Sequence, residues 1–184
     1  MRFETNRLIL RPWSIQDAVD LYQQAKNPNV GPMAGWPVHT SVENSKEIIE
    51  KYLSGPLTYA ICLKDNKIIG SIELQDANHL SQEIGELEIG YWIGQEYWGN
   101  EYTVEAMKCL IQYAFDELES PGLWCGYYDE NHKSKRVMEK CGFMYHHSEK
   151  EFKEKKNINY MYLKKEDLNY VLFTNYGSKK LYTK

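Results

Sequence analysis

The 184-residue sequence lacks the cysteine and histidine patterns of a metal-binding or disulfide-stabilised protein. Its four cysteines are far apart and include no CxxC pair, and three of them lie in apolar periodic segments, where a reduced thiol packs as a small hydrophobic group. His132, His146 and His147 have neither metal-ligand spacing nor a cysteine partner. We therefore predict free thiols and no bound metal.

Long apolar runs and an excess of one charge are also missing. No stretch approaches the roughly 20 apolar residues of a membrane span, and residues 1–7 carry charge where a signal peptide needs an apolar run. The net charge is −4, with acidic and basic residues mixed throughout, so no field draws in nucleic acid. We expect a cytoplasmic protein that binds neither membranes nor nucleic acid.

Repeats, low-complexity tracts and interdomain linkers are absent as well. A chain of 184 residues can build one domain with a proper core and is too short for two. We predict a single domain over residues 1–165 and a C-terminal tail, 166–184, that is docked or flexible. The tail keeps four apolar residues, Leu168, Val171, Leu172 and Phe173.

The segment 86–106 is the part around which we expect the rest to be organised. Its first half alternates, with Leu87, Ile89, Tyr91 and Ile93 on one face, as a strand requires. A glycine-bearing loop over 94–99 then leads into an amphipathic helix. A helix N-terminus beside a strand offers free N–H groups to a phosphate, but the pattern fits an ordinary connection equally well.

The remaining segments predict a mixed sheet. Ser14 and Asp17 form an acidic capping box, Ser41 or Thr40 caps a second helix, and Gly142 ends a short one. The fold class is α/β (α+β), with a mostly antiparallel central sheet and helices on both faces. We expect strands at 8–10, 58–63, 67–74, 87–93, 123–128, 143–146 and 158–163, helices at 14–25, 41–53, 100–118 and 133–140, and a solvated connection at 149–156.

Three separated segments carry a family resemblance. Together with the order of elements, the match covers residues 3–165. The chain resembles a GNAT-superfamily N-acetyltransferase, of the RimJ/RimL-like branch that includes the ribosomal-protein N-terminal acetyltransferases. The segments are TNRLILRPW (5–13), EIGYWI (88–93) running into YWGNEYTVEA (97–106), and NHKSKRVMEKCGF (131–143).

The resemblance implies acetyl-CoA as co-substrate and a primary amine as acceptor. We expect no metal, and the quaternary state, monomer or homodimer, stays open. The resemblance places the co-substrate where the central strand splays from the strand 123–128. The implied contacts are the central-strand residues Tyr91, Trp92 and Ile93, the loop residues Trp98, Gly99, Asn100, Glu101, Tyr102 and Thr103, and, near the thiol, Asn131 and Ser134.

The sequence departs from this family at Glu101, where the phosphate loop commonly has glycine. Glycine suits a backbone that approaches phosphate closely or adopts positive φ. Glu101 is either an ordinary acid in the first helical turn, with its side chain in solvent, or a carboxylate that repels the pyrophosphate and weakens CoA binding.

The chemistry needs a general base, because an amine at neutral pH is mostly ammonium and must lose a proton before it attacks the thioester. Glu88 is our candidate, with an arginine ion pair as its structural alternative, and Glu73 is a second candidate. Backbone N–H groups of the splayed strand would stabilise the oxyanion.

The departing thiolate needs a proton donor. Many related enzymes use a tyrosine on the last short helix, where this chain has Met138. Ser134 is the substitute that the resemblance suggests, directly or through water, although it could equally be a surface or capping hydroxyl. Tyr127 and Tyr128 remain open as alternative proton donors.

The acceptor side is expected to include Met33, Trp36 and Glu73, although a role for the aromatic loop in covering the core is as well supported. Three functions stay open. They are acetyl transfer to a peptide N-terminus or small amine, CoA binding or acyl sensing with little turnover, and acetylation of an antibiotic. No readable motif in the loops selects the acceptor.

Overall fold

The structure, a computed structural model, describes residues 1–151, 156–168 and 182–183. It divides into two compact units. The first contains Met1–Glu73, Tyr91–Ala106 and the last strand, and the second contains Leu74–Gly90 and the described residues of 107–168. The prediction of one domain over 1–165 stays a prediction, and residues 169–181 of the predicted tail lie outside the described residues.

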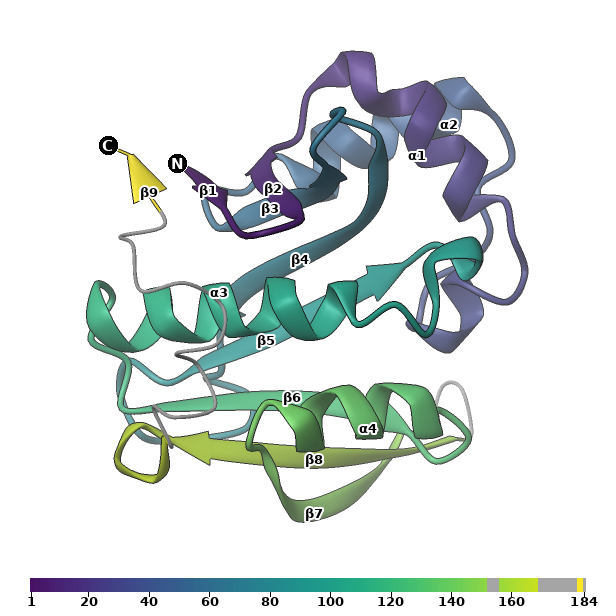
Figure 1. Cartoon of the computed structure of the whole chain (residues 1–184). Helices are drawn as coiled ribbons and strands as arrows, with labels where there is room; N and C mark the ends of the chain where they lie inside the picture. Colours follow the sequence, from purple (N-terminus) through teal and green to yellow (C-terminus); the bar gives the residue numbers. More distant parts are fainter. Residues whose placement is uncertain (152–155, 169–181, 184) are drawn as a thin grey trace. The chain divides into compact units, whose positions relative to one another are not determined.

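The sheet of the first unit begins with a strand that the sequence did not suggest. In β1 (Arg2–Glu4) only Phe3 is buried, so three residues carry no readable alternation. β1 pairs antiparallel with β2, with Phe3 opposite Leu10, and with β9. The strand order here is β9-β1-β2-β3-β4-β5, with β2, β3 and β4 side by side in Figure 1. The bounds are β2 Leu8–Pro12, β3 Thr58–Leu63, β4 Ile68–Asp76, β5 Leu87–Ile93 and β9 Tyr182–Thr183.

The helices of the first unit begin where the caps were predicted. The Ser14 N–H donates to Asp17 Oδ2 at 2.8 Å, as in a capping box, and Ser41 Oγ accepts from the Asn44 N–H at 3.0 Å. The predicted helix 41–53 is α-helical only in its first half and ends as a π-helix. The elements are η1 Ile15–Asp17, α1 Ala18–Ala25, η2 Gly31–Met33, α2 Val42–Ile48 and η3 Ile49–Leu53.

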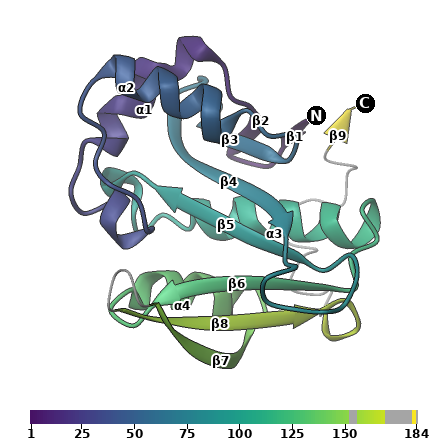
Figure 2. The same ribbon diagram turned by 180° about the vertical axis from the view of Figure 1, so that it is seen from behind.

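The second unit has the strand order β4-β5-β6-β8-β7, in which β5 and β6 are parallel and the pairs β6–β8 and β8–β7 are antiparallel. α4 packs on one face of β6 and β8, in front of them in Figure 1 and behind them in Figure 2. Gly142 lies just beyond the end of α4, and its φ of +92° is the left-handed cap that the sequence indicated. The bounds are β6 Gly122–Tyr128, α4 His132–Lys140, β7 Met144–Glu151 and β8 Lys156–Lys164.

The predicted solvated connection at 149–156 is wrong at its two ends, because β7 continues to Glu151 and β8 begins at Lys156, and residues 152–155 lie outside the described residues. Charged side chains suggested a loop, yet backbone pairing holds this hairpin, with Glu149 opposite Ile158 and Lys150 opposite Asn157. Exposed strands tolerate charge, and charged side chains on an edge strand also discourage aggregation.

The long helix α3 (Tyr102–Asp116) starts in the first unit and continues into the second. Its apolar stripe is buried as predicted, over Met107, Leu110, Ile111, Ala114 and Phe115. All four cysteines lie in the described part of the chain, where they are buried and form no disulfide. No helix among the described residues has the length and apolarity needed to cross a bilayer.

Candidate active site

The loop between β5 and α3 is fixed by hydrogen bonds within itself. It contains the short 3-10 helix η4 (Gln95–Tyr97). The Trp98 indole N–H donates to the Ile93 carbonyl at 3.1 Å, and the Asn100 amide donates to the carbonyls of Tyr97 at 3.2 Å and Trp98 at 3.3 Å. One predicted cofactor contact, the Ile93 carbonyl, is therefore already engaged by Trp98.

Two residues of this loop adopt left-handed backbone conformations, Gly99 with φ of +81° and Glu101 with φ of +61°. The Glu101 carbonyl accepts from the Glu105 N–H at 3.1 Å, so Glu101 occupies the position just before α3. Glu101 was expected as an ordinary acid in the first turn of the helix. That position is wrong, because Glu101 precedes the first turn, but its side chain is exposed as expected. For a residue with a Cβ this conformation costs roughly 1–2 kcal/mol.

The same loop presents backbone donors. In this fully described segment, the N–H groups of Gly99, Asn100, Tyr102 and Thr103 make no hydrogen bond to another part of the described chain. Those of Tyr102 and Thr103, at the start of a 15-residue helix, carry the positive end of its dipole. The arrangement suits a diphosphate, which accepts several N–H donors and favours that field.

A buried carboxylate anchors the start of α3. Glu105, with 1% of its side chain exposed, accepts from Thr5 Oγ1 at 2.5 Å, from the Arg7 N–H at 2.8 Å and from Arg7 Nε at 2.6 Å. Arg7 Nη1 also donates to the Asn100 carbonyl at 2.9 Å, and the guanidinium lies 4.6 Å from the centre of the Tyr102 ring. Sequence reasoning missed these roles, since about a hundred residues separate the partners.

Glu88 lies on β5 in the second unit, with 15% of its side chain exposed. Its carboxylate accepts from Gln75 Nε2 at 2.8 Å, and His79 Nε2 lies 3.4 Å from the same oxygen. The arginine ion pair offered as its alternative is therefore wrong. His79 is the residue that sequence reasoning missed here, because a polar loop histidine carries no signal of its partner.

β5 and β6 separate just beyond Glu88. Within the described residues their ladder contains two pairs, Leu87 with Leu123 and Glu88 with Trp124, whereas β6 pairs with β8 along its whole length. At the next position the Cys125 thiol donates to the Ile89 carbonyl at 3.0 Å. Burial raises the pKa of Cys125 well above its ordinary value, so the thiol keeps the proton that makes this bond.

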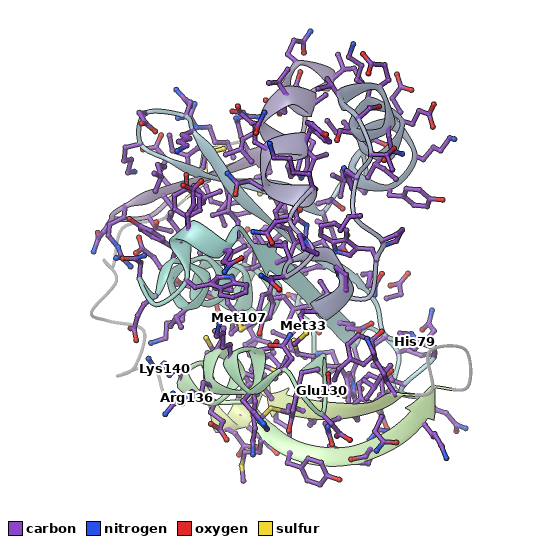
Figure 3. All side chains as sticks on the ribbon, turned by 90° about the vertical axis from the view of Figure 1, so that its right-hand side faces the viewer. Met33, His79, Met107, Glu130, Arg136 and Lys140 are labelled. Atoms are coloured by element: carbon purple, nitrogen blue, oxygen red, sulfur yellow. The ribbon has the colours of Figure 1, made fainter. Side chains whose placement is uncertain are left out.

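α4 places Ser134 near its N-terminus. Asn131 is the N-cap, and its side-chain oxygen accepts from the Ser134 N–H at 3.1 Å. Met138, at the position of the family's tyrosine, is fully buried. Burial raises the pKa of Tyr127, which makes that phenol a weaker proton donor. Figure 3 shows Arg136 and Lys140, one helical turn apart, on the same side of α4.

The residues expected to bind the acceptor lie in the first unit. Trp36 packs edge-on against Trp92 at 5.5 Å between ring centres, and Trp92 stacks on Trp13 at 6.5 Å. Met33 ends the short helix η2 in the same loop as Trp36. Glu73 accepts a hydrogen bond from Thr58 Oγ1 at 3.3 Å. The structure thus brings Trp36 together with Trp92 of the predicted cofactor strand.

Comparison with known proteins gives consistent matches. The family described as "Acetyltransferase (GNAT) domain" matches residues 7–144. N-acetyltransferase p20 of Bacillus licheniformis, described as uncharacterized, is 29% identical over 145 residues, or 76% of this chain and 80% of that protein. The provisionally named ribosomal N-acetyltransferase YdaF of Bacillus subtilis (strain 168) is 35% identical over 82 residues, or 45% of this chain and 43% of that one.

A solved structure shows the same fold. The crystal structure of a GNAT-family acetyltransferase from Bacillus anthracis matches with a TM-score of 0.79 at 21% identity, covering 90% of this chain and 99% of that one. The predicted fold class, a mixed and mostly antiparallel sheet with helices, is confirmed.

Proposed function

Because the chain belongs to the GNAT acetyltransferase family, we propose that it transfers the acetyl group of acetyl-CoA directly to a primary amine, either a peptide N-terminus or a small amine. Acetyl-CoA supplies the activated thioester. The observation that carries the proposal is the set of backbone N–H groups at Gly99, Asn100, Tyr102 and Thr103, which suit the diphosphate of CoA.

We assign the general base to Glu88. Its carboxylate is held by Gln75 and His79, and a carboxylate fixed in this way can accept the proton that an ammonium acceptor must lose. The exposed His79 side chain beside it offers a route for that proton to solvent. Glu73, the second candidate, accepts a bond from the Thr58 hydroxyl, and we rank Glu88 above it because His79 lies beside Glu88.

We assign protonation of the leaving thiolate to Ser134. The Asn131 cap fixes the first turn of α4 on which Ser134 sits. Met138 is buried in the core and carries no exchangeable proton, so it cannot replace the family's tyrosine. A Ser134→Ala variant should lower kcat while leaving the dissociation constant of CoA unchanged. Unaltered kcat would exclude Ser134.

As the acceptor, we propose the N-terminus of a ribosomal protein in preference to a small polyamine. The support is the match to YdaF, whose name gives ribosomal N-acetyltransferase activity, although the match covers less than half of either chain. Release of free thiol from acetyl-CoA should be measured with peptides that copy ribosomal-protein N-termini and with spermidine. Turnover with spermidine alone would redirect the assignment to small amines.

A second function, CoA binding with little turnover, is favoured by Glu101 in a position that suits glycine and by the absence of a hydroxyl at Met138. Isothermal titration with acetyl-CoA and CoA separates the two. Micromolar binding with amine-dependent thiol release supports the enzyme. Micromolar binding without release for any amine supports the sensor, and no binding at millimolar concentration overturns both.

A further inference from the structure

The backbone of the cofactor loop is held from outside by the N-terminal segment. Arg7 Nη1 donates to the Asn100 carbonyl at 2.9 Å, 93 residues away along the chain. The Asn100–Glu101 peptide is trans, so fixing its carbonyl toward Arg7 directs the Glu101 N–H to the opposite side. The bond therefore sets the orientation of one peptide in the middle of the loop.

Arg7 can hold that peptide because Glu105 holds Arg7. The Glu105 carboxylate receives both the backbone N–H and the Nε of Arg7, and Thr5 Oγ1 completes its set of donors. A guanidinium offers donors in a rigid fork, so Nε and Nη1 can serve two acceptors at once. The fork links a side chain in the first turn of α3 to the carbonyl that precedes the helix.

The ring of Tyr102 limits the remaining freedom of the guanidinium, which lies 4.6 Å from its centre. The face of Arg7 is thus against Tyr102, and its edge is used by Glu105 and Asn100. A lysine could keep the charge near Glu105, but its single ammonium would not reproduce the two directed bonds.

We propose that Arg7, held in place by Glu105, is a positioning residue that sets the affinity of the Gly99–Thr103 loop for the diphosphate of CoA. It acts through the Asn100 carbonyl rather than as a phosphate ligand. This inference rests on the proposed function, because it takes CoA to be the molecule that the loop binds.

The test compares Arg7→Lys with a matched control, Arg2→Lys. Arg2 lies in β1, and its ion pair with Glu4 has both side chains more than half exposed. Dissociation constants for CoA and for pantetheine, which lacks the diphosphate, are measured by isothermal titration. Amide hydrogen exchange is followed at Glu105, whose N–H donates to the Glu101 carbonyl, and thermal unfolding confirms that each variant is folded at the assay temperature.

The expected result for Arg7→Lys is a CoA dissociation constant raised about tenfold, an unchanged pantetheine constant and faster exchange at the Glu105 amide, with Arg2→Lys like the wild type. Equal weakening of CoA and pantetheine would indicate a general structural role and overturn the inference. So would an unchanged CoA constant in Arg7→Lys. Wild-type protein that does not bind CoA at all would overturn the proposed function and this inference together.

Discussion

Replacing Glu101 with glycine should raise the stability of the protein and its affinity for CoA, through two separate causes. The φ of +61° costs a residue with a Cβ roughly 1–2 kcal/mol, and glycine adopts it freely. Glycine also has more conformational freedom in the unfolded chain, which reduces the gain in folding free energy by about 0.5–1 kcal/mol. The free energy of unfolding should therefore rise by about 0.5–1 kcal/mol, or about 2 °C in Tm for a chain of this size.

The affinity effect comes from the removed charge. Two unit charges about 5 Å apart in water repel by about 0.8 kcal/mol, which is roughly fourfold in a dissociation constant. Glu101→Gly should bind CoA about fourfold more tightly at low ionic strength. The gain should shrink as salt is added, because the carboxylate is exposed and screening acts on it.

Two companion variants separate the causes. Glu101→Gln removes the charge and keeps the left-handed backbone, so it should gain affinity without stability. Gly99→Ala adds a Cβ at φ of +81°, where no atom lies within 4 Å of it, so it should lose about 1 kcal/mol through the backbone alone. Urea unfolding and isothermal titration measure both quantities. Unchanged stability in Glu101→Gly would refute the strain argument, and an unchanged CoA constant in Glu101→Gln would refute the repulsion.

Three other outcomes are expected. Glu88→Gln should lower kcat by about a hundredfold or more with an unchanged CoA dissociation constant, and wild-type turnover in a coupled thiol assay would remove Glu88 as base. Burial lowers the pKa of His39 from its ordinary value of 6.5. As the pH falls through 6.5, the unfolded chain therefore takes up a proton at His39 before the folded chain does, and the folded state loses stability at lower pH. Urea midpoints at pH 7 and 5 should differ less in His39→Gln. Gly70→Ala would bring a Cβ within 2.3 Å of the Trp92 carbonyl, which should destabilise the protein by about 1–3 kcal/mol in urea titration.

Local pattern predicted the elements whose side chains alternate or cap. β5 followed from the alternation of apolar residues over 87–93, and the start of the first helix followed from Ser14 and Asp17, since these signals depend on residues close in sequence. β1 could not be predicted, because its stability comes from pairing with strands on both sides rather than from its three residues.

The strands at 143–146 and 158–163 were predicted, and only their extent was not, for a related reason. The charged residues at their inner ends suggested a loop, while the structure pairs them in the β7–β8 ladder and adds contacts with a distant residue. Asn157 and Asn159 donate their side-chain amides to the two oxygens of Asp129 at 2.8 and 2.6 Å. These bonds lower the pKa of Asp129, and their donors lie some thirty residues away. The pattern of side chains along the sequence does not identify a distant partner such as Asp129.

The candidate site divides in the same way. The unusual residue at 101 was visible in the sequence because glycine and glutamate differ in which φ they tolerate, and the positive φ confirms that reasoning. The loss of a hydroxyl at Met138 was visible by position. The partners of Glu88 and the ties between Arg7, Glu105 and Asn100 were not, because each joins segments that only the folded chain brings together.

The strain at Glu101 and the ties from Arg7 have a common explanation. A residue held in a left-handed conformation persists only where its surroundings over-determine it. Here the carbonyl before Glu101 is held by Arg7, and the carbonyl of Glu101 itself accepts the first bond of α3 from Glu105. The carbonyls on both sides of the strained residue are thus fixed by way of Glu105, one through its carboxylate and Arg7 and the other through its backbone N–H. If this view is right, Arg7→Lys should lose less stability in a Glu101→Gly background than in the wild type, because glycine no longer needs to be held. Equal losses in both backgrounds would show that the two features are independent.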